Sequence, residues 1–158
     1  MSSQVRQAAL ASHEELVAAP FAVVWRLLEE KVYHPDRSVP GVENVRIVKD
    51  GGPAGVERLM HHKGKGSDIH ELITWESDAS KGVVNFTMLE DPSLEGVVKN
   101  FAETAGEATT IVRYSMDWKF GPSAPADAKP PFPDNGAGAI KGAVLAMKKQ
   151  AEEAFASR

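Results

Sequence analysis

Hydrophobic and polar residues alternate along most of the central part of this chain. In TTIVRYSMDWKF (109–120) the even positions from Val112 to Trp118 are apolar, and the odd positions from Arg113 to Lys119 are polar. A period of two residues is typical of a strand with one buried face and one face in water. The other predicted strands are a first one around residues 13–15 and then ENVRIVK (43–49), VERLMHH (56–62), DIHELITWES (68–77), VVNFTML (83–89) and VVKNFAET (97–104). We predict an antiparallel sheet of about seven strands with one apolar face.

The period changes to that of an α-helix after residue 138. In AIKGAVLAMKKQAEEAFASR (139–158), Ile140, Val144, Met147, Ala151 and Phe155 form one apolar stripe, which predicts a long amphipathic helix over 139–156. A shorter helix is predicted from near Pro20, a favourable first-turn residue, to about Lys31. Its apolar positions are Phe21, Val24, Leu27 and Leu28. The predicted class is therefore α+β.

The segment boundaries indicate one domain over residues 1–158. Residues 1–8 are predicted to be a loose N-terminal segment, and HPDRSVPG (34–41) a turn or a short helix. GPSAPADAKPPFPDNGAG (121–138) contains five of the ten prolines. Because proline interrupts both strand ladders and helix interiors, this stretch is a predicted loop.

A hairpin brings most of the histidines together. VERLMHH and DIHELITWES flank KGKGS. A two-residue turn at Lys65–Gly66, or a four-residue one, would pair Met60 with Glu71 and His61 with His70. Alternation then predicts which polar groups share a face, because paired residues lie on the same side of a sheet. Arg58, His62 and Glu71 are predicted on the apolar side, and Glu57, His61, His70 and Glu76 on the wet side.

The wet side of this hairpin is a weak candidate for a metal site. His61 and His70 supply two nitrogen ligands, and Asp68 or Glu57 is the available third, whereas a metal needs at least three ligands on one side. An exposed cross-strand histidine pair is the preferred interpretation. We predict no metal and no cofactor.

Composition and charge exclude several classes of function. The chain has 18 Lys+Arg against 22 Asp+Glu, a formal net charge of -4, and no extended basic run, so we expect no nucleic-acid or anionic-membrane partner. It has no cysteine, which excludes thiol catalysis and disulfides. No leader-like or membrane-spanning apolar run is present, and we expect a cytoplasmic protein. Hydrolase, metalloprotease and nucleotide-binding signatures are also missing.

The order of a strand, short helices, six antiparallel strands and a long final helix resembles the helix-grip architecture of the START/Bet v 1-like (SRPBCC) superfamily, in which a curved sheet wraps around the final helix. Within it, VWRLLEEKVYHPDRSVPGVENVRIVKD, GVERLM, HELITWES and TTIVRYSMDWKF resemble the AtaL-like (DUF1857) group. The resemblance implies a hydrophobic cavity between sheet and final helix for lipids, sterols, polyketides or plant-type hormones. Some members only bind ligands, whereas others are aromatase/cyclases or related enzymes, and the fold does not choose between these activities.

The candidate site is the inner face of the sheet. Its predicted polar groups are Arg58, His62, Glu71, Asn100 and Tyr114. The predicted apolar lining is Met60, Ile69, Ile73, Trp75, Phe86, Met88, Met116 and Trp118 from the sheet, with Ile140, Val144 and Met147 from the helix. A few polar groups in an apolar pocket are typical of a ligand site.

Two hypotheses follow from this face. One is a carrier of a hydrophobic small molecule. The alternative is a polyketide cyclase-like enzyme in which Glu71 acts as acid or base and Arg58 and Tyr114 polarise the substrate. Arg58 and Glu71 either neutralise each other or face the ligand. Leu145, outside the helix stripe, leaves a homodimer as a further alternative.

Overall fold

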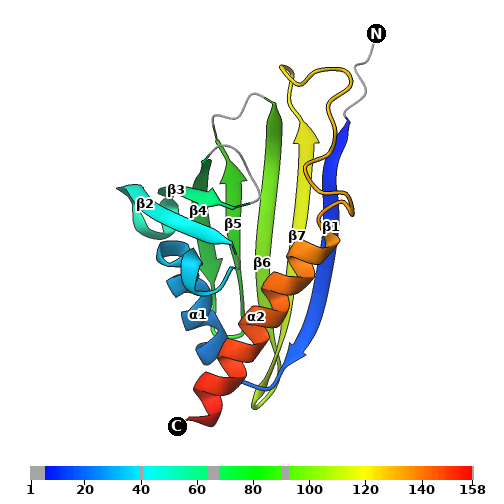
Figure 1. Ribbon diagram of the computed structural model, residues 1–158. Coiled ribbons are helices and arrows are strands. Elements are labelled where there is room, and N and C mark those ends of the chain that lie inside the picture. The colour runs from blue at the N-terminus through cyan, green and yellow to red at the C-terminus, as the bar shows by residue number, and fades with distance from the viewer. Residues whose placement is uncertain (1–5, 40, 64–67, 90–92, 158) are drawn as a thin grey trace.

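The sheet and two helices make up most of the molecule. We describe a computed structural model for residues 6–39, 41–63, 68–89 and 93–157. Seven antiparallel strands follow the spatial order β1-β7-β6-β5-β4-β3-β2, and α1 and α2 lie on the same face of the sheet (Figure 1). The strands are β1 (Gln7–Val17), β2 (Val42–Asp50), β3 (Val56–His62), β4 (Ile69–Ser77), β5 (Lys81–Met88), β6 (Leu94–Gly106) and β7 (Thr109–Phe120); the helices are α1 (Phe21–Tyr33) and α2 (Ala137–Ala156), with short 3-10 turns at Pro35–Arg37 and Gly52–Ala54. The predicted fold class is confirmed.

The core lies between the sheet and the helices, where alternation and helical period predicted it. Ile140, Val144, Met147 and Ala151 of α2 are buried, and Leu145, on the other side of the helix, is 40% exposed. Helix α2 packs on β1 and β7 and meets α1. It therefore covers the β1–β7 side of the curved sheet (Figure 1).

Two predicted boundaries need correction. Residues 1–8 are not all a loose segment, because β1 begins at Gln7 and Ala8 is fully buried. The loop predicted over 121–138 ends earlier, since α2 begins at Ala137. Asp134 accepts hydrogen bonds from the backbone N–H groups of Gly136 and Gly138, and these bonds satisfy donors that the first turn of a helix leaves without partners.

The predicted register of the β3–β4 hairpin is wrong by two residues. Met60 pairs with Ile69 and Arg58 with Glu71, whereas His70 lies opposite Leu59 and not opposite His61. The predicted turn at Lys65–Gly66 lies outside the described residues. A shift of two residues leaves every side chain on its predicted face, which is why the sorting into an inner and an outer set was right although the pairing was not.

Gly96 allows β6 and β7 to approach closely. Its φ is +143°, and a Cβ atom there would lie 2.1 Å from the backbone oxygen of Asp117. We expect Gly96→Ala to lower the free energy of unfolding by at least about 2 kcal/mol, because only backbone movement relieves this clash. In the matched control, Gly142→Ala in α2, the added Cβ has no atom within 4 Å, and a gain of about 0.5–1 kcal/mol is expected. Urea denaturation followed by circular dichroism measures both, and equal stability of the two variants would contradict this account.

Candidate functional site

A cavity of about 130 Å³ lies between the inner face of the sheet and α2. Strands β3 to β7 form its floor, and α1, α2 and the loop before α2 form its walls. Its lining residues are Lys31, Val39, Arg58, Met60, His62, Ile69, Glu71, Phe86, Val98, Tyr114, Met116, Trp118, Phe132, Ala139, Ile140 and Ala143. The wall is apolar except for a small set of polar groups, as ligand pockets commonly are.

The polar and apolar parts of the wall lie at different ends. Tyr114, Met116 and Trp118 follow one another along the inner face of β7. Tyr114 belongs to the polar end, where its ring lies beside Lys31. Trp118 belongs to the apolar end, where its ring centroid lies 5.8 Å from that of Phe132. The cavity thus fits an amphiphilic molecule with a polar head and an apolar body.

Arg58 and Glu71 form a buried ion pair at the polar end. Arg58 Nη2 donates to Glu71 Oε1 over 2.8 Å, and the two residues are only 2% and 6% exposed. Arg58 Nη1 also donates to the backbone oxygens of Lys31 and Val32, which are among the carbonyls that the end of a helix leaves without partners. The pair therefore connects β3 and β4 to the C-terminus of α1 through hydrogen bonds. Both residues also line the cavity.

Lys31 places a second cation next to this pair. It is 7% exposed, its Nζ donates to Asn100 Oδ1, and the same atom lies 4.2 Å from the centre of the Tyr114 ring. Burial lowers the pKa of the Lys31 amine to about 7, with a further lowering from the nearby Arg58 charge, while Glu71 acts in the opposite direction. The amine therefore changes its charge near neutral pH, which is unusual for lysine.

Three hydrogen-bond donors at the polar end have no partner among the described residues. They are Arg58 Nε, Asn100 Nδ2 and the Tyr114 hydroxyl. Burial raises the pKa of Tyr114, so its hydroxyl keeps its proton at neutral pH and remains a donor. A buried donor without an acceptor costs free energy, and a bound acceptor would remove this cost.

The predicted site residues divide between the cavity wall and the solid core. Arg58, Glu71 and Tyr114 line the cavity together with His62, Met60, Ile69, Phe86, Met116, Trp118 and Ile140. Asn100 is fully buried and reaches the cavity only through Lys31. The others belong to the packed core away from the cavity: Ile73, Val144 and Met147 are fully buried, and Trp75 and Met88 pack against the core from its edge.

Lys31 is the most important residue that sequence reasoning missed. It lies three residues after Leu28 and seven after Val24, both fully buried, and these spacings place all three on one face of a helix. A lysine on the apolar face of the predicted helix was therefore the signal by which Lys31 could have been recognised as a buried residue. The remaining missed lining residues are Val39, Val98, Phe132, Ala139 and Ala143. Four of them come from loops or from the edge of the α2 stripe.

The outer-face histidines have separate acidic neighbours. His61 Nδ1 lies 3.3 Å from Asp68, and His70 Nε2 lies 3.5 Å from Glu57. The two-residue register shift moves the histidines out of the predicted cross-strand pair. Among the described residues, no group of three His, Cys, Asp or Glu side chains is arranged to hold a metal ion.

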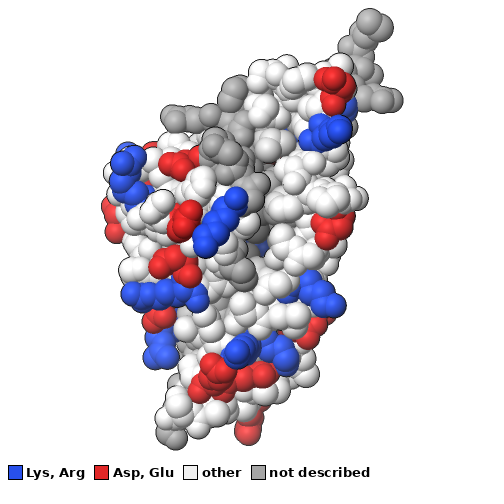
Figure 2. Space-filling model, in the orientation of Figure 1, with Lys and Arg blue, Asp and Glu red and all other residues white. Residues whose placement is uncertain are grey.

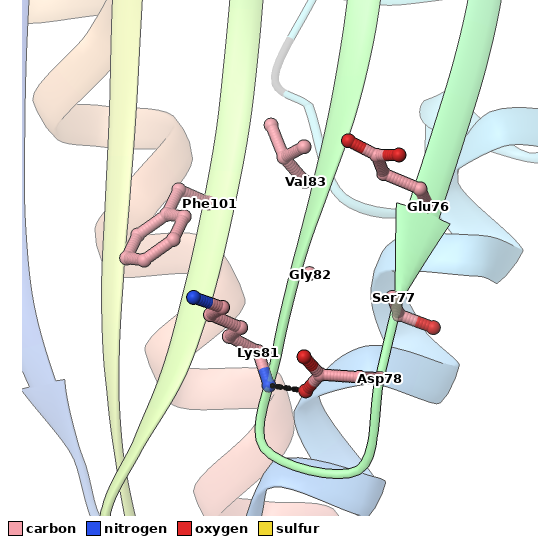
Figure 3. A pocket seen from close by; sticks show the side chains of 7 residues that line it. All are labelled: Glu76, Ser77, Asp78, Lys81, Gly82, Val83 and Phe101. Atoms are coloured by element: carbon pink, nitrogen blue, oxygen red, sulfur yellow. Dashed lines mark hydrogen bonds between the residues drawn. The ribbon is translucent and has the colours of Figure 1, made fainter.

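A second depression lies at the β4–β5 turn, on the sheet face turned away from the helices (Figure 3). Asp78 there accepts hydrogen bonds from the backbone N–H groups of Ser80 and Lys81, and these bonds lower the pKa of its carboxyl group. The carboxylate closes the turn, which accounts for it without a ligand. The lining is Glu76, Ser77, Asp78, Lys81, Gly82, Val83 and Phe101.

The charged surface gives no competing site on the face that carries the helices. Figure 2 shows basic and acidic residues interspersed over this face, with no extended area of one sign. In the described part of the chain, neither helix has the length and apolar character needed to cross a membrane. The cavity is therefore the candidate functional site.

Comparison with solved structures finds the same fold at low sequence identity. Norcoclaurine synthase from Thalictrum flavum, in complex with dopamine and hydroxybenzaldehyde, is 18% identical, with 97% of this chain and 95% of that chain covered and a TM-score of 0.68. Zhui aromatase/cyclase from Streptomyces sp. R1128 is 20% identical, with 95% of each chain covered and a TM-score of 0.68. The human StarD13 lipid transfer and protein localization domain is 14% identical, with 89% and 75% covered and a TM-score of 0.63.

These likenesses establish the fold. The chain has the helix-grip architecture of START and Bet v 1-like proteins, as its sequence predicted. No protein-family model matches the sequence, and no curated protein matches it either. The AtaL-like subgroup therefore stays a prediction, and the function has to be argued from the cavity.

Proposed function

We propose that this helix-grip chain binds a small, mostly apolar molecule about the size of one ring in the cavity beneath α2. The observation that carries the proposal is the cavity itself, apolar at one end and lined by buried donors at the other. Hydrophobic small molecules are also what the START and Bet v 1-like architecture leads us to expect.

The volume of the cavity limits the size of its ligand. At about 130 Å³ it is close to an engineered apolar cavity of about 150 Å³ that takes up benzene. It is smaller than the roughly 300–1,000 Å³ of pockets for drug-sized ligands. A single ring or a short chain therefore fits, whereas a multi-ring polyketide or a whole lipid requires α2 or the neighbouring loops to move.

Filling the cavity is expected to abolish binding. Ala143 lines the cavity from α2, so Ala143→Phe places a ring in the space that the ligand would occupy. Leu145→Phe is the matched control, because Leu145 lies on the exposed side of the same helix. Toluene, benzyl alcohol, benzamide and benzoate are suitable probes, and Trp118 in the cavity wall reports binding through its fluorescence.

We expect at least one probe to bind the wild type and Leu145→Phe, and none to bind Ala143→Phe. Thermal unfolding of all three proteins confirms that they are folded. Unchanged binding by Ala143→Phe, or the failure of every probe to bind the wild type, would refute the proposal.

A second candidate function is proton transfer on a bound carbonyl compound. Lys31 supports it, because a lysine amine that titrates near neutrality is suited to act as a general base. This differs from the cyclase-like hypothesis that Glu71 is the acid or base, since Glu71 is held by Arg58. The test is the exchange of the α-hydrogens of phenylacetone in heavy water, followed by NMR. We expect Lys31→Met to reduce the exchange rate to that measured without protein. If Glu71→Gln loses the exchange activity and Lys31→Met keeps it, Glu71 is the base instead.

A further inference from the structure

Charge is not balanced at the polar end of the cavity. Arg58 has the Glu71 carboxylate as its direct counter-ion. Lys31 makes no direct ion pair among the described residues: its amine contacts the Asn100 amide oxygen and aromatic ring faces, and the Glu71 charge acts on it from further away. The protonated cluster therefore holds two cations and one anion. A buried cation without a counter-ion is costly, so this end of the cavity favours one further negative charge.

The unpartnered hydrogen-bonding groups point to the same kind of ligand. Arg58 Nε and Asn100 Nδ2 can only donate, and the Tyr114 hydroxyl can donate or accept. Each belongs to a residue at most 2% exposed. Arg58 and Tyr114 line the cavity, whereas Asn100 does not. Among the described residues, no carboxylate or amide oxygen of the polar end is left without a partner, so its unpartnered groups are mainly donors.

From these contacts we propose that the cavity is a site for a small monocarboxylic acid whose carboxylate lies between Lys31, Arg58 and Tyr114 and whose single-ring or short-chain body lies against Met116, Trp118 and Phe132. The inference rests on the proposed function and adds the chemical class of the ligand. A carboxylate supplies the missing charge and up to four acceptor positions. A neutral amide or alcohol of the same size supplies acceptors without the charge.

The surroundings of Lys31 determine how binding depends on pH. The charged or titratable groups that face it are Arg58 from β3, Glu71 from β4 and Tyr114 from β7. His62 lines the same cavity, and α2 contributes only apolar residues. Because Lys31 loses its proton at a pH of about 7, a carboxylate should bind more tightly below this pH than above it, and its binding should draw a proton onto the amine.

Titration calorimetry with benzoate, benzamide and benzyl alcohol tests the inference on the intact protein. We expect benzoate to bind the wild type at least about tenfold more tightly than either neutral probe below the pKa of Lys31, as hydrogen bonds to charged groups are stronger than neutral ones. Lys31→Met should remove this preference. Lys148→Met is the matched control, because Lys148 does not line the cavity and its amine bonds to Glu152 and to the Leu16 backbone oxygen, and it should keep the preference.

A further variant guards against a Lys31→Met protein that does not fold. Tyr114→Phe removes one donor without changing the charge, and we expect it to weaken benzoate severalfold and benzyl alcohol less. Equal affinities of the wild type for benzoate and the neutral probes would overturn the carboxylate inference and leave the proposed function standing. Failure of all three probes to bind would overturn both.

Discussion

Replacing Glu71 with leucine is expected to lower the free energy of unfolding by about 3–5 kcal/mol, which is the usual cost of leaving a buried charge without its partner. Arg58 is 2% exposed, so water cannot replace the lost carboxylate. Its remaining bonds, to the backbone oxygens of Lys31 and Val32, bring it no countercharge. With Lys31 nearby, the site would then contain two cations and no anion.

The chain contains a matched surface pair that isolates the effect of burial. Arg113 Nη1 lies 2.9 Å from Glu14 Oε1, with both side chains about half exposed, at 47% and 52%. Glu14→Leu removes the same kind of contact between neighbouring strands β1 and β7 and should cost less than about 1 kcal/mol. Urea denaturation of the two variants gives the comparison. If Glu71→Leu costs no more than Glu14→Leu, the Arg58–Glu71 pair is not desolvated.

A double variant tests whether the cost lies in the isolated charge. Arg58→Met combined with Glu71→Leu removes both ions, and we expect it to be more stable than Glu71→Leu alone. It should not regain the full stability of the wild type, because the Lys31 and Val32 carbonyls lose their donor. A double variant of intermediate stability would mean that Arg58 has two roles. It neutralises the Glu71 carboxylate, and it donates hydrogen bonds to the backbone oxygens at the end of α1.

The sequence predicted the sheet well because alternation depends only on which face each residue occupies. Asn100 and Tyr114 were placed inward from their neighbours along the strand, and both are buried in directly paired positions of β6 and β7. Pairing across a turn requires the exact loop conformation as well. The β3–β4 register was therefore wrong by two residues, while the side-chain faces of Arg58 and Glu71 were correct.

The cavity wall was less predictable than the core. Ile73 and Val144 have the same inward pattern as Met60 and Ile140, but only the latter two line the cavity. Periodicity gives the face of a residue, and it does not say where along the strand or helix the packing leaves a cavity. Phe132 reaches the cavity from a proline-rich loop that has no periodicity to interpret. Lys31 is hard to recognise as a cavity residue from sequence, since a lysine near a helix end ordinarily extends into water.

Stability should depend on pH through Lys31. In the unfolded chain its amine keeps a proton up to its ordinary pKa of 10.5, whereas in the folded protein it loses it at about 7. Between these values the unfolded state binds more protons, so the contribution of Lys31 to the free energy of unfolding rises with pH. Below this window the full penalty of a buried, protonated amine applies.

Lys31→Met removes that penalty. Near neutral pH and below, we expect the variant to be more stable than the wild type by about 2 kcal/mol. Removing the buried charge stabilises the folded variant by several kcal/mol, and leaving the Asn100 side-chain oxygen without its donor costs about 1–3 kcal/mol. The difference should shrink as pH rises from about 7 toward 10.5 and then reverse. Urea denaturation over this range measures it, with Lys148→Met as a control that should show no such trend. A difference between Lys31→Met and the wild type that does not change with pH would contradict the assignment.

The sign of the stability change in Lys31→Met tells whether Lys31 stabilises the fold or serves a ligand. A side chain whose removal stabilises the folded protein does not serve the fold, and sites that bind or react often carry such a cost. A ligand that binds only the folded state adds to its stability. If the ligand is a carboxylate, benzoate should stabilise the wild type most below the pKa of Lys31 and should have little effect on Lys31→Met. The same cation then destabilises the empty protein and stabilises the complex, as expected of a residue whose role is to hold an anion.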